Sequence, residues 1–173
     1  MIGRSLFALY DILFFTKVLV YGSKGADMTT TTLYEKDFVA WTQAQADLLR
    51  QAQFNQLDIA NLVEEIEDMG KNRQRELSSR LQVLLSHLLK WQYQPERQSP
   101  SWEIPIQLQR AEIMDLLTDN PSLRPQVADF VLRAYPKARL AARGETSLEL
   151  KVFPTVCPYT FKEILDNNFF PEA

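Results

Sequence analysis

The feature that most constrains this chain is a long stretch without proline, from Asp58 to Gln94. Asp58 is suited to the N-cap of a helix, and a continuous helix over this stretch would be about 55 Å long. Gly70 costs about 1 kcal/mol relative to alanine inside a helix, so it is the place where a bend or break is expected. Apolar residues recur in the steps of three, four and seven that mark one helix face: Ile59, Leu62, Val63, Ile66, Met69, Leu77, Leu81, Leu84, Leu85, Leu88 and Leu89.

The charges along this stretch divide it into two parts. Carboxylates gather before Gly70 and basic residues follow it, and i,i+4 pairs such as Glu67 with Lys71 add about 0.2–0.5 kcal/mol each. After Leu81 the polar face thins out. We therefore expect residues 58–70 to form an exposed acidic segment, and the part from 77 to 91 to be the centre of the core.

Shorter helical patterns flank the long one. Thr32 and Glu35 have the spacing of a capping box, which predicts a helix over 34–53. Prolines interrupt the chain after the long helix, so a third helix is expected to begin between Ser101 and Pro105.

The remaining segments become less regular toward the C-terminus. A fourth helix is expected to carry the apolar residues of 127–138, with a kink or split at Pro136. We expect 148–156 to be loop, 158–165 to be a short helix, and the apolar segment 169–171 to dock on the body. The predicted fold is all-α, a helical bundle of four to five main helices around one long helix, with an irregular C-terminal tail and a short final helix.

The length of 173 residues fits one helical domain over 28–173, preceded by an extension over 1–27. Part of that extension, 6–21, is apolar, but Asp11 and a lysine interrupt it, and a membrane span needs about 20 apolar residues. Three interpretations stay open for the extension: a signal or anchor, a segment upstream of a natural start at Met28, and a packed or interfacial helix.

The composition limits the compartment and the cofactors. The net charge is −3, and the chain has a single cysteine and a single histidine. One thiol cannot form an internal disulfide, which favours a reducing, cytoplasmic location, and a structural zinc site needs several such ligands. We predict no cofactor, no membrane partner, and a role for Cys157 as a small buried apolar residue.

One candidate site combines carboxylates with the histidine. Glu64, Glu67 and Asp68 have i,i+3 and i,i+4 spacings, which let carboxylates share a divalent metal. A metal-dependent hydrolase would use Glu64, Glu67 and His87 as catalytic residues. His87 would lie roughly 30 Å away along a continuous helix, so it joins the cluster only if the helix breaks near Gly70. We expect instead an acidic helix start without a metal, favoured by the helix dipole.

A second candidate is a ligand-binding group formed by His87, Lys90, Trp91 and Arg97. His87 and Trp91 share a helix face at i,i+4, and cations beside aromatic rings can hold an anion or stack on a base. The alternative interpretation is that Trp91 and Tyr93 cap the core while His87 bonds to a backbone carbonyl.

A third candidate is a basic face on the third and fourth helices. Acidic residues are interspersed along it, whereas nucleic-acid binding needs clustered positive charge, so a nucleic-acid partner is not expected. The basic residues are Arg110, Arg124, Arg133, Lys137, Arg139 and Arg143.

Five blocks of the sequence carry a resemblance to a known family. They are Tyr34-Glu35-x-Asp37-Phe38-x-x-Trp41, Asn61–Gly70, His87–Pro95, Asn120–Arg124 and Cys157-Pro158-Tyr159. Together they resemble the bacterial family called domain of unknown function twenty-nine, DUF29, which is common in cyanobacteria. The resemblance covers roughly 32–172. It implies an all-helical fold in a small bacterial protein, and it brings no activity and no catalytic residues.

These observations favour a protein-association module without catalytic activity, with a homodimer as one form of it. The sequence contains no phosphate-binding glycine loop, nucleophile elbow or His-Glu-x-x-His motif. Two alternatives stay open: a metal-dependent hydrolase that uses the acidic helix and His87, and a helical protein that binds nucleic acid. The sequence leaves any small-molecule ligand undetermined.

Overall fold

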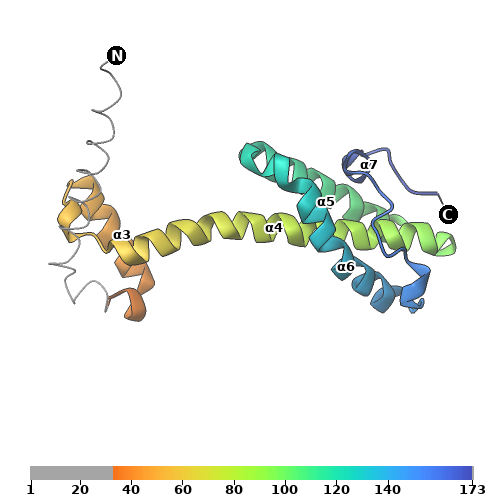
Figure 1. The fold of residues 1–173 in the computed structure, drawn as a ribbon, viewed down its shortest axis with the longest axis horizontal. Helices are drawn as coiled ribbons and strands as arrows, with labels where there is room; N and C mark the ends of the chain where they lie inside the picture. The colour runs from red at the N-terminus through yellow and green to blue at the C-terminus, as the bar shows by residue number, and fades with distance from the viewer. Residues whose placement is uncertain (1–32, 173) are drawn as a thin grey trace, which may run out of the picture. The chain divides into compact units, whose positions relative to one another are not determined.

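The computed structural model describes residues 33–172, and all regular structure in this part of the chain is helical (Figure 1). The all-α prediction is therefore confirmed, while the expectations for residues 1–27 and for Thr32 lie outside the described residues. The chain divides into two compact units, up to Asp68 and from Met69 onward. The α-helices are α3 (Phe38–Arg50), α4 (Ile59–Tyr93), α5 (Pro100–Asp119), α6 (Val127–Thr146) and α7 (Phe161–Leu165).

The long helix predicted from the sequence is confirmed. α4 runs unbroken for 35 residues, so the break considered at Gly70 does not occur. A methyl group added at Gly70 would meet no atom within 4 Å. None of the helices within 33–172 is both long and apolar enough to cross a membrane.

In the first unit, α3 begins later than the predicted residue 34. Residues 33–36 are helical, but Asp37 interrupts them and caps α3 by accepting a hydrogen bond from the Ala40 backbone N–H at 2.9 Å. The helix also ends at Arg50, before the predicted residue 53. Ala52 has a φ of 56°, which a right-handed helix cannot contain.

A small polar and aromatic interior holds the first unit together. Trp41 is 1% exposed, and its indole Nε1 donates to Asp58 Oδ2 at 3.3 Å. The Asp58 backbone N–H donates in turn to Gln45 Oε1 at 2.9 Å. The rings of Tyr34 and Trp41 meet edge to face, with centroids 4.9 Å apart. As predicted, Asp58 caps α4, accepting from the Asn61 backbone N–H at 3.4 Å.

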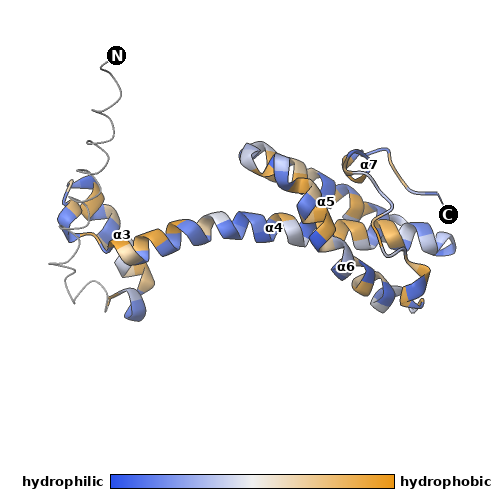
Figure 2. Cartoon of the chain, in the orientation of Figure 1, coloured by the Kyte–Doolittle hydropathy of each residue, from blue (hydrophilic) through white to orange (hydrophobic). Residues whose placement is uncertain are grey.

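In the second unit, the C-terminal half of α4 is the centre of one hydrophobic core. α5 and α6 lie beside this half (Figure 1), and the hydrophobic positions of all three helices gather where they meet (Figure 2). The prediction of a buried 77–91 segment is thus confirmed for its leucines. The α4 residues with 0% exposure are Leu77, Leu81, Leu84, Leu85, Leu88 and Leu89.

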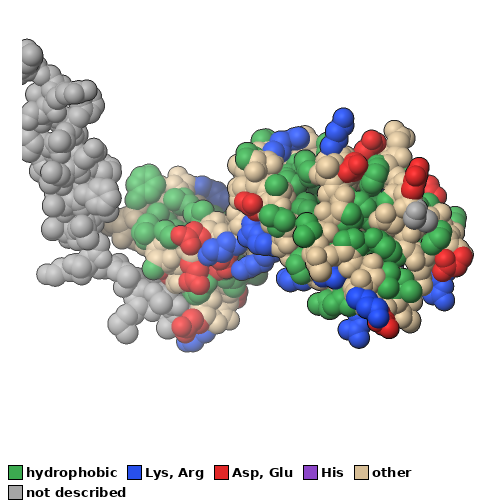
Figure 3. All heavy atoms as spheres, turned by 45° about the vertical axis from the view of Figure 1, so that its right-hand side comes forward, with side chains coloured by type: hydrophobic (Ala, Val, Ile, Leu, Met, Phe, Trp, Pro, Cys, Tyr) green, Lys and Arg blue, Asp and Glu red, His purple; other side chains and the backbone are tan. Residues whose placement is uncertain are grey.

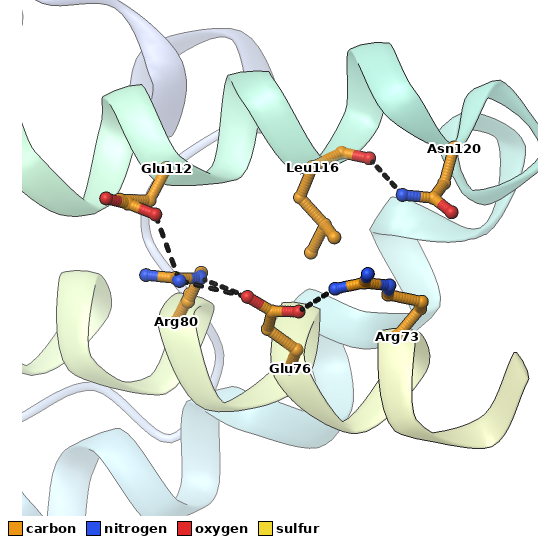
Figure 4. Close-up of polar contacts among 6 residues, drawn as sticks. All are labelled: Arg73, Glu76, Arg80, Glu112, Leu116 and Asn120. Carbon is orange, nitrogen blue, oxygen red and sulfur yellow. Dashed lines mark hydrogen bonds and ion pairs between the residues drawn. The ribbon is translucent and has the colours of Figure 1, made fainter. Parts of the chain in front are cut away.

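An ionic network also joins α4 to α5 (Figure 4). Glu76 accepts from Arg80 at 2.9 Å and from Arg73 at 3.0 Å. Arg80 also pairs with Glu112 of α5 at 3.0 Å. The two arginines lower the pKa of Glu76. The i,i+4 pair of Glu76 and Arg80 therefore also contributes to the contact between α4 and α5.

The prolines set the helix boundaries differently from the prediction. α5 begins at Pro100, so Pro105 lies inside it, and α6 is not split at Pro136. Pro136 and Leu132, whose carbonyl loses its i+4 donor, both lie on the exposed side of α6. Water can therefore replace the missing hydrogen bond.

The tail agrees with the prediction in outline. Residues 148–156 contain only the short 3₁₀ turn Leu150–Val152, and α7 is shorter than the predicted 158–165. A complete capping box starts α7: Thr160 and Glu163 each accept from the other's backbone N–H. Phe169 and Phe170 pack against the core, so the predicted docking of this segment is confirmed.

Candidate functional site

The structure does not gather the predicted metal ligands. Within residues 33–172 there is no group of three or more His, Cys, Asp or Glu side chains that could hold a metal ion. Glu64 and Glu67 are exposed near the start of α4. Because α4 continues through Gly70, the fold-back that would bring His87 to them does not take place.

His87 bonds to the backbone, as one interpretation of the sequence had it. Its Nδ1 lies 2.9 Å from the carbonyl oxygen of Val83, and because a carbonyl can only accept, Nδ1 carries the hydrogen. Burial lowers the pKa of His87, and the nearby Lys90 lowers it further. The ring is therefore neutral at neutral pH.

Lys90 is buried and already paired. It is 2% exposed, and its ammonium forms an ion pair with Glu145 of α6. Its Nζ also lies 5.1 Å from the centroid of the Trp102 ring. Lys90 therefore connects α4, α5 and α6.

Trp91 and Arg97, the other two residues of the predicted ligand-binding group, differ in burial. Trp91 is half-buried, and its ring centroid lies 4.8 Å from that of Phe170. Arg97 is exposed in the 3₁₀ turn Pro95–Arg97. The Tyr93 ring meets Phe153 edge to face, with centroids 5.4 Å apart. Trp91 and Tyr93 thus pack on the core, as the alternative interpretation had it.

The predicted basic face is only partly a surface. Arg110 is fully buried: its Nε donates to the Ile164 carbonyl at 2.8 Å and its Nη2 to the Phe169 carbonyl at 2.7 Å. Burial lowers the pKa of Arg110. Arg139 likewise donates to the carbonyls of Leu150 and Phe153. Acidic, basic and hydrophobic side chains are mixed on the face drawn in Figure 3.

Cys157 is half-buried and bonded within the tail. Its thiol donates to the carbonyl oxygen of Tyr159 at 3.5 Å. Burial is the main cause that raises the pKa of the thiol. Cys157 is therefore protonated at neutral pH, which is unfavourable for a nucleophile.

The most distinctive surface is apolar and lies on the first turns of α4. We call Ile59, Val63, Ile66 and Met69 the α4 stripe. Their spacing places them along one side of the helix. By contrast, the leucines farther along α4 have 0% exposure. The sequence predicted an exposed segment over 58–70, and the structure confirms that these four apolar side chains are more than half exposed. The four residues, with exposed fractions, are Ile59 (57%), Val63 (51%), Ile66 (65%) and Met69 (69%).

The comparison with protein families decides the affiliation. The model of the family described as "Domain of unknown function DUF29" matches residues 33–170. This chain belongs to the DUF29 family. Neither the curated proteins nor the solved structures give a match to it.

Several residues of the DUF29 blocks contact one another. The Tyr34 hydroxyl, in the first block, donates to Glu65 Oε1 in the second at 2.6 Å, and this bond raises the pKa of Tyr34 to about 12. The Tyr159 hydroxyl, in the last block, donates to Gln92 Oε1 in the third at 2.7 Å. These DUF29 blocks therefore stabilise the fold.

Proposed function

We propose that this protein acts by associating with another protein through the α4 stripe. The observation that carries the proposal is the exposure of Ile59, Val63, Ile66 and Met69, which are each more than half exposed. Fully burying such a side chain from water contributes about 1.5–3 kcal/mol, and a partner that covers the part still exposed here gains a share of that. Contiguous exposed apolar surface of this kind is typical of interaction sites.

The state of the chemically reactive residues supports the same proposal. The Nδ1 of His87 is hydrogen-bonded to a backbone carbonyl. Lys90 is paired with Glu145, and burial raises the pKa of Cys157. These side chains serve the packing of the second unit. The four side chains of the α4 stripe, in contrast, each leave more than half of their surface exposed.

A site-specific cross-link tests the proposal. A photo-reactive amino acid replaces Ile66 in the full chain, in cells of the source organism, and the adducts are identified by mass spectrometry. The matched control carries the same group at Glu64, which is exposed and lies about 160° around the helix from Ile66. We expect one defined protein adduct at Ile66 and none at Glu64. Equal labelling at both positions, or no adduct at Ile66, would refute the proposal.

A further inference from the structure

We infer that the partner of this protein presents a basic amphipathic helix, which lies along one face of the hairpin that α3 forms with the start of α4. This inference rests on the proposed function and names the chemistry of the partner. Three observations lead to it. Exposed apolar residues of both helices lie on one side of the hairpin, the hairpin has very little interior of its own, and its charge is strongly negative.

The apolar residues of α4 lie to one side of the contact between α4 and α3. Glu65 marks this contact, because its carboxylate accepts from the Tyr34 hydroxyl at 2.6 Å. Each residue of an α-helix turns about 100° around the axis, so Ile66 lies about 100° from Glu65. Ile59 and Val63 lie about 120° and 160° from Glu65 in the same sense of rotation. All three apolar side chains are more than half exposed.

Phe38 of α3 lies on the same side of the hairpin. Trp41 marks the contact of α3 with α4, because its indole Nε1 donates to Asp58 at 3.3 Å. Phe38 lies about 60° around the α3 axis from Trp41, in the same sense of rotation. The contacts along α3 and α4 pair in reverse order, so the helices are antiparallel. When two antiparallel helices face each other, equal senses of rotation lead to the same side of the pair. We call Phe38, Ile59, Val63 and Ile66 the hairpin face.

The hairpin does not bury this face by itself. Trp41 is the single buried hydrophobic side chain among residues 33–68, and the rings of Tyr34 and Phe38 pack on it. A unit of this size gains little from its own interior, because small units bury a small share of their surface. An amphipathic helix laid along the hairpin face would add the missing apolar contacts, as in the recognition of helices by apolar surfaces.

The charge of the hairpin selects the kind of helix. Residues 33–68 contain eight acidic and two basic side chains, a net charge of −6, whereas the whole chain carries −3. Glu67 is exposed and follows Val63 by four residues, at the border of the hairpin face. A helix with lysine or arginine beside its apolar residues complements this surface, which orients and speeds the association. The same negative charge repels a second hairpin, the phosphates of nucleic acid and anionic lipids.

Binding of synthetic peptides to the purified full chain tests the inference. The probe is a peptide of leucine and lysine, about 18 residues or five helical turns long, with leucine at helical spacing. One control peptide has the same composition with leucine and lysine alternating, and a second has glutamate in place of lysine. Fluorescence anisotropy should show that the probe binds about tenfold or more tightly than either control, and that sodium chloride weakens its binding. Equal binding of the alternating or the acidic peptide would overturn the inference.

Variants of the full chain locate the binding. Ile66→Ser and Phe38→Ser each remove one apolar side chain of the hairpin face, and each should weaken probe binding about tenfold. The matched control is Leu132→Ser on α6, because Leu132 is 63% exposed and lies outside the hairpin. Circular dichroism shows whether Phe38→Ser keeps its helices, and the exposed Ile66 carries the test if it does not. Equal effects of Ile66→Ser and Leu132→Ser would overturn the inference.

The cross-link at Ile66 separates this inference from the proposed function, because mass spectrometry also identifies the attached segment. A basic segment with helical apolar spacing would support both. A defined adduct to an acidic segment, or to a second copy of this chain, would overturn the basic helix and leave protein association standing. An adduct within one chain would overturn both.

Discussion

Replacing Glu145 with glutamine should destabilise the second unit more than replacing Lys90 with methionine. Lys90 is 2% exposed, whereas the Glu145 side chain is 54% exposed. In Glu145→Gln the ammonium stays buried without its counter-ion, which for a fully buried pair costs about 3–5 kcal/mol. Because water reaches Glu145, we expect Glu145→Gln to lower the free energy of unfolding by about 1–3 kcal/mol. Lys90→Met removes the buried charge and keeps the stem. It leaves the half-exposed Glu145 to water, and it loses the cation–π contact with Trp102, which is worth about 0.5–1 kcal/mol.

Urea unfolding followed by circular dichroism measures the free energy of unfolding of each variant. The comparison holds if this free energy falls with urea concentration at the same slope in all of them. The double variant gives the coupling between the two sites. Once residue 90 is methionine, Glu145→Gln should cost almost nothing, since no buried charge remains. The reasoning is refuted if Glu145→Gln costs no more than Lys90→Met, or if the two single effects simply add.

Three further predictions concern single side chains. The pKa of His87 should lie below 6.5 because the ring is partly buried. The unfolded chain then binds more protons than the folded chain, so the free energy of unfolding is highest above about pH 6.5 and falls as the pH decreases. An NMR titration of this single histidine checks it, and a pKa of 6.5 or more contradicts it. Thr160→Ala removes the α7 capping box and should cost about 1 kcal/mol in urea unfolding, while the same change at exposed Thr155 should cost less than half as much. Cys157 should react with a thiol reagent much more slowly in the native protein than in urea, because burial raises its pKa; equal rates would rule this out.

The spacing of apolar residues predicted α4 because this pattern is local and repeats over many helical turns. The buried leucines from Leu77 to Leu89 follow the helical spacing found in the sequence. α3 begins later than predicted because Asp37 interrupts the helical residues 33–36 and caps the helix that follows. Gly144 is a residue type suited to end a helix, yet α6 continues to Thr146 and the left-handed residue is Ser147, with a φ of 61°. A single sequence does not show which of several suitable residues takes that role.

The candidate site was less predictable than the fold. Lys90 and Glu145 are 55 positions apart, and no local pattern relates them. Arg110 looks like a surface residue by type, because arginine is rarely fully buried, and only the carbonyls of the distant tail make its burial possible. The α4 stripe has the same helical spacing as the core leucines. Exposure depends on where the neighbouring helices end, and spacing along one helix does not contain that information.

The contacts of Arg110 also have a consequence for the order in which the protein is made. Arg110 lies in α5, which is synthesised before the tail. Its guanidinium is buried against the carbonyls of Ile164 and Phe169, which accept its hydrogen bonds. Until residue 169 has left the ribosome, Arg110 must stay hydrated, and the core around it cannot close. The second unit therefore reaches its native packing only after this tail has been made. A product that stops before Phe169 lacks the carbonyl that accepts from Arg110 Nη2.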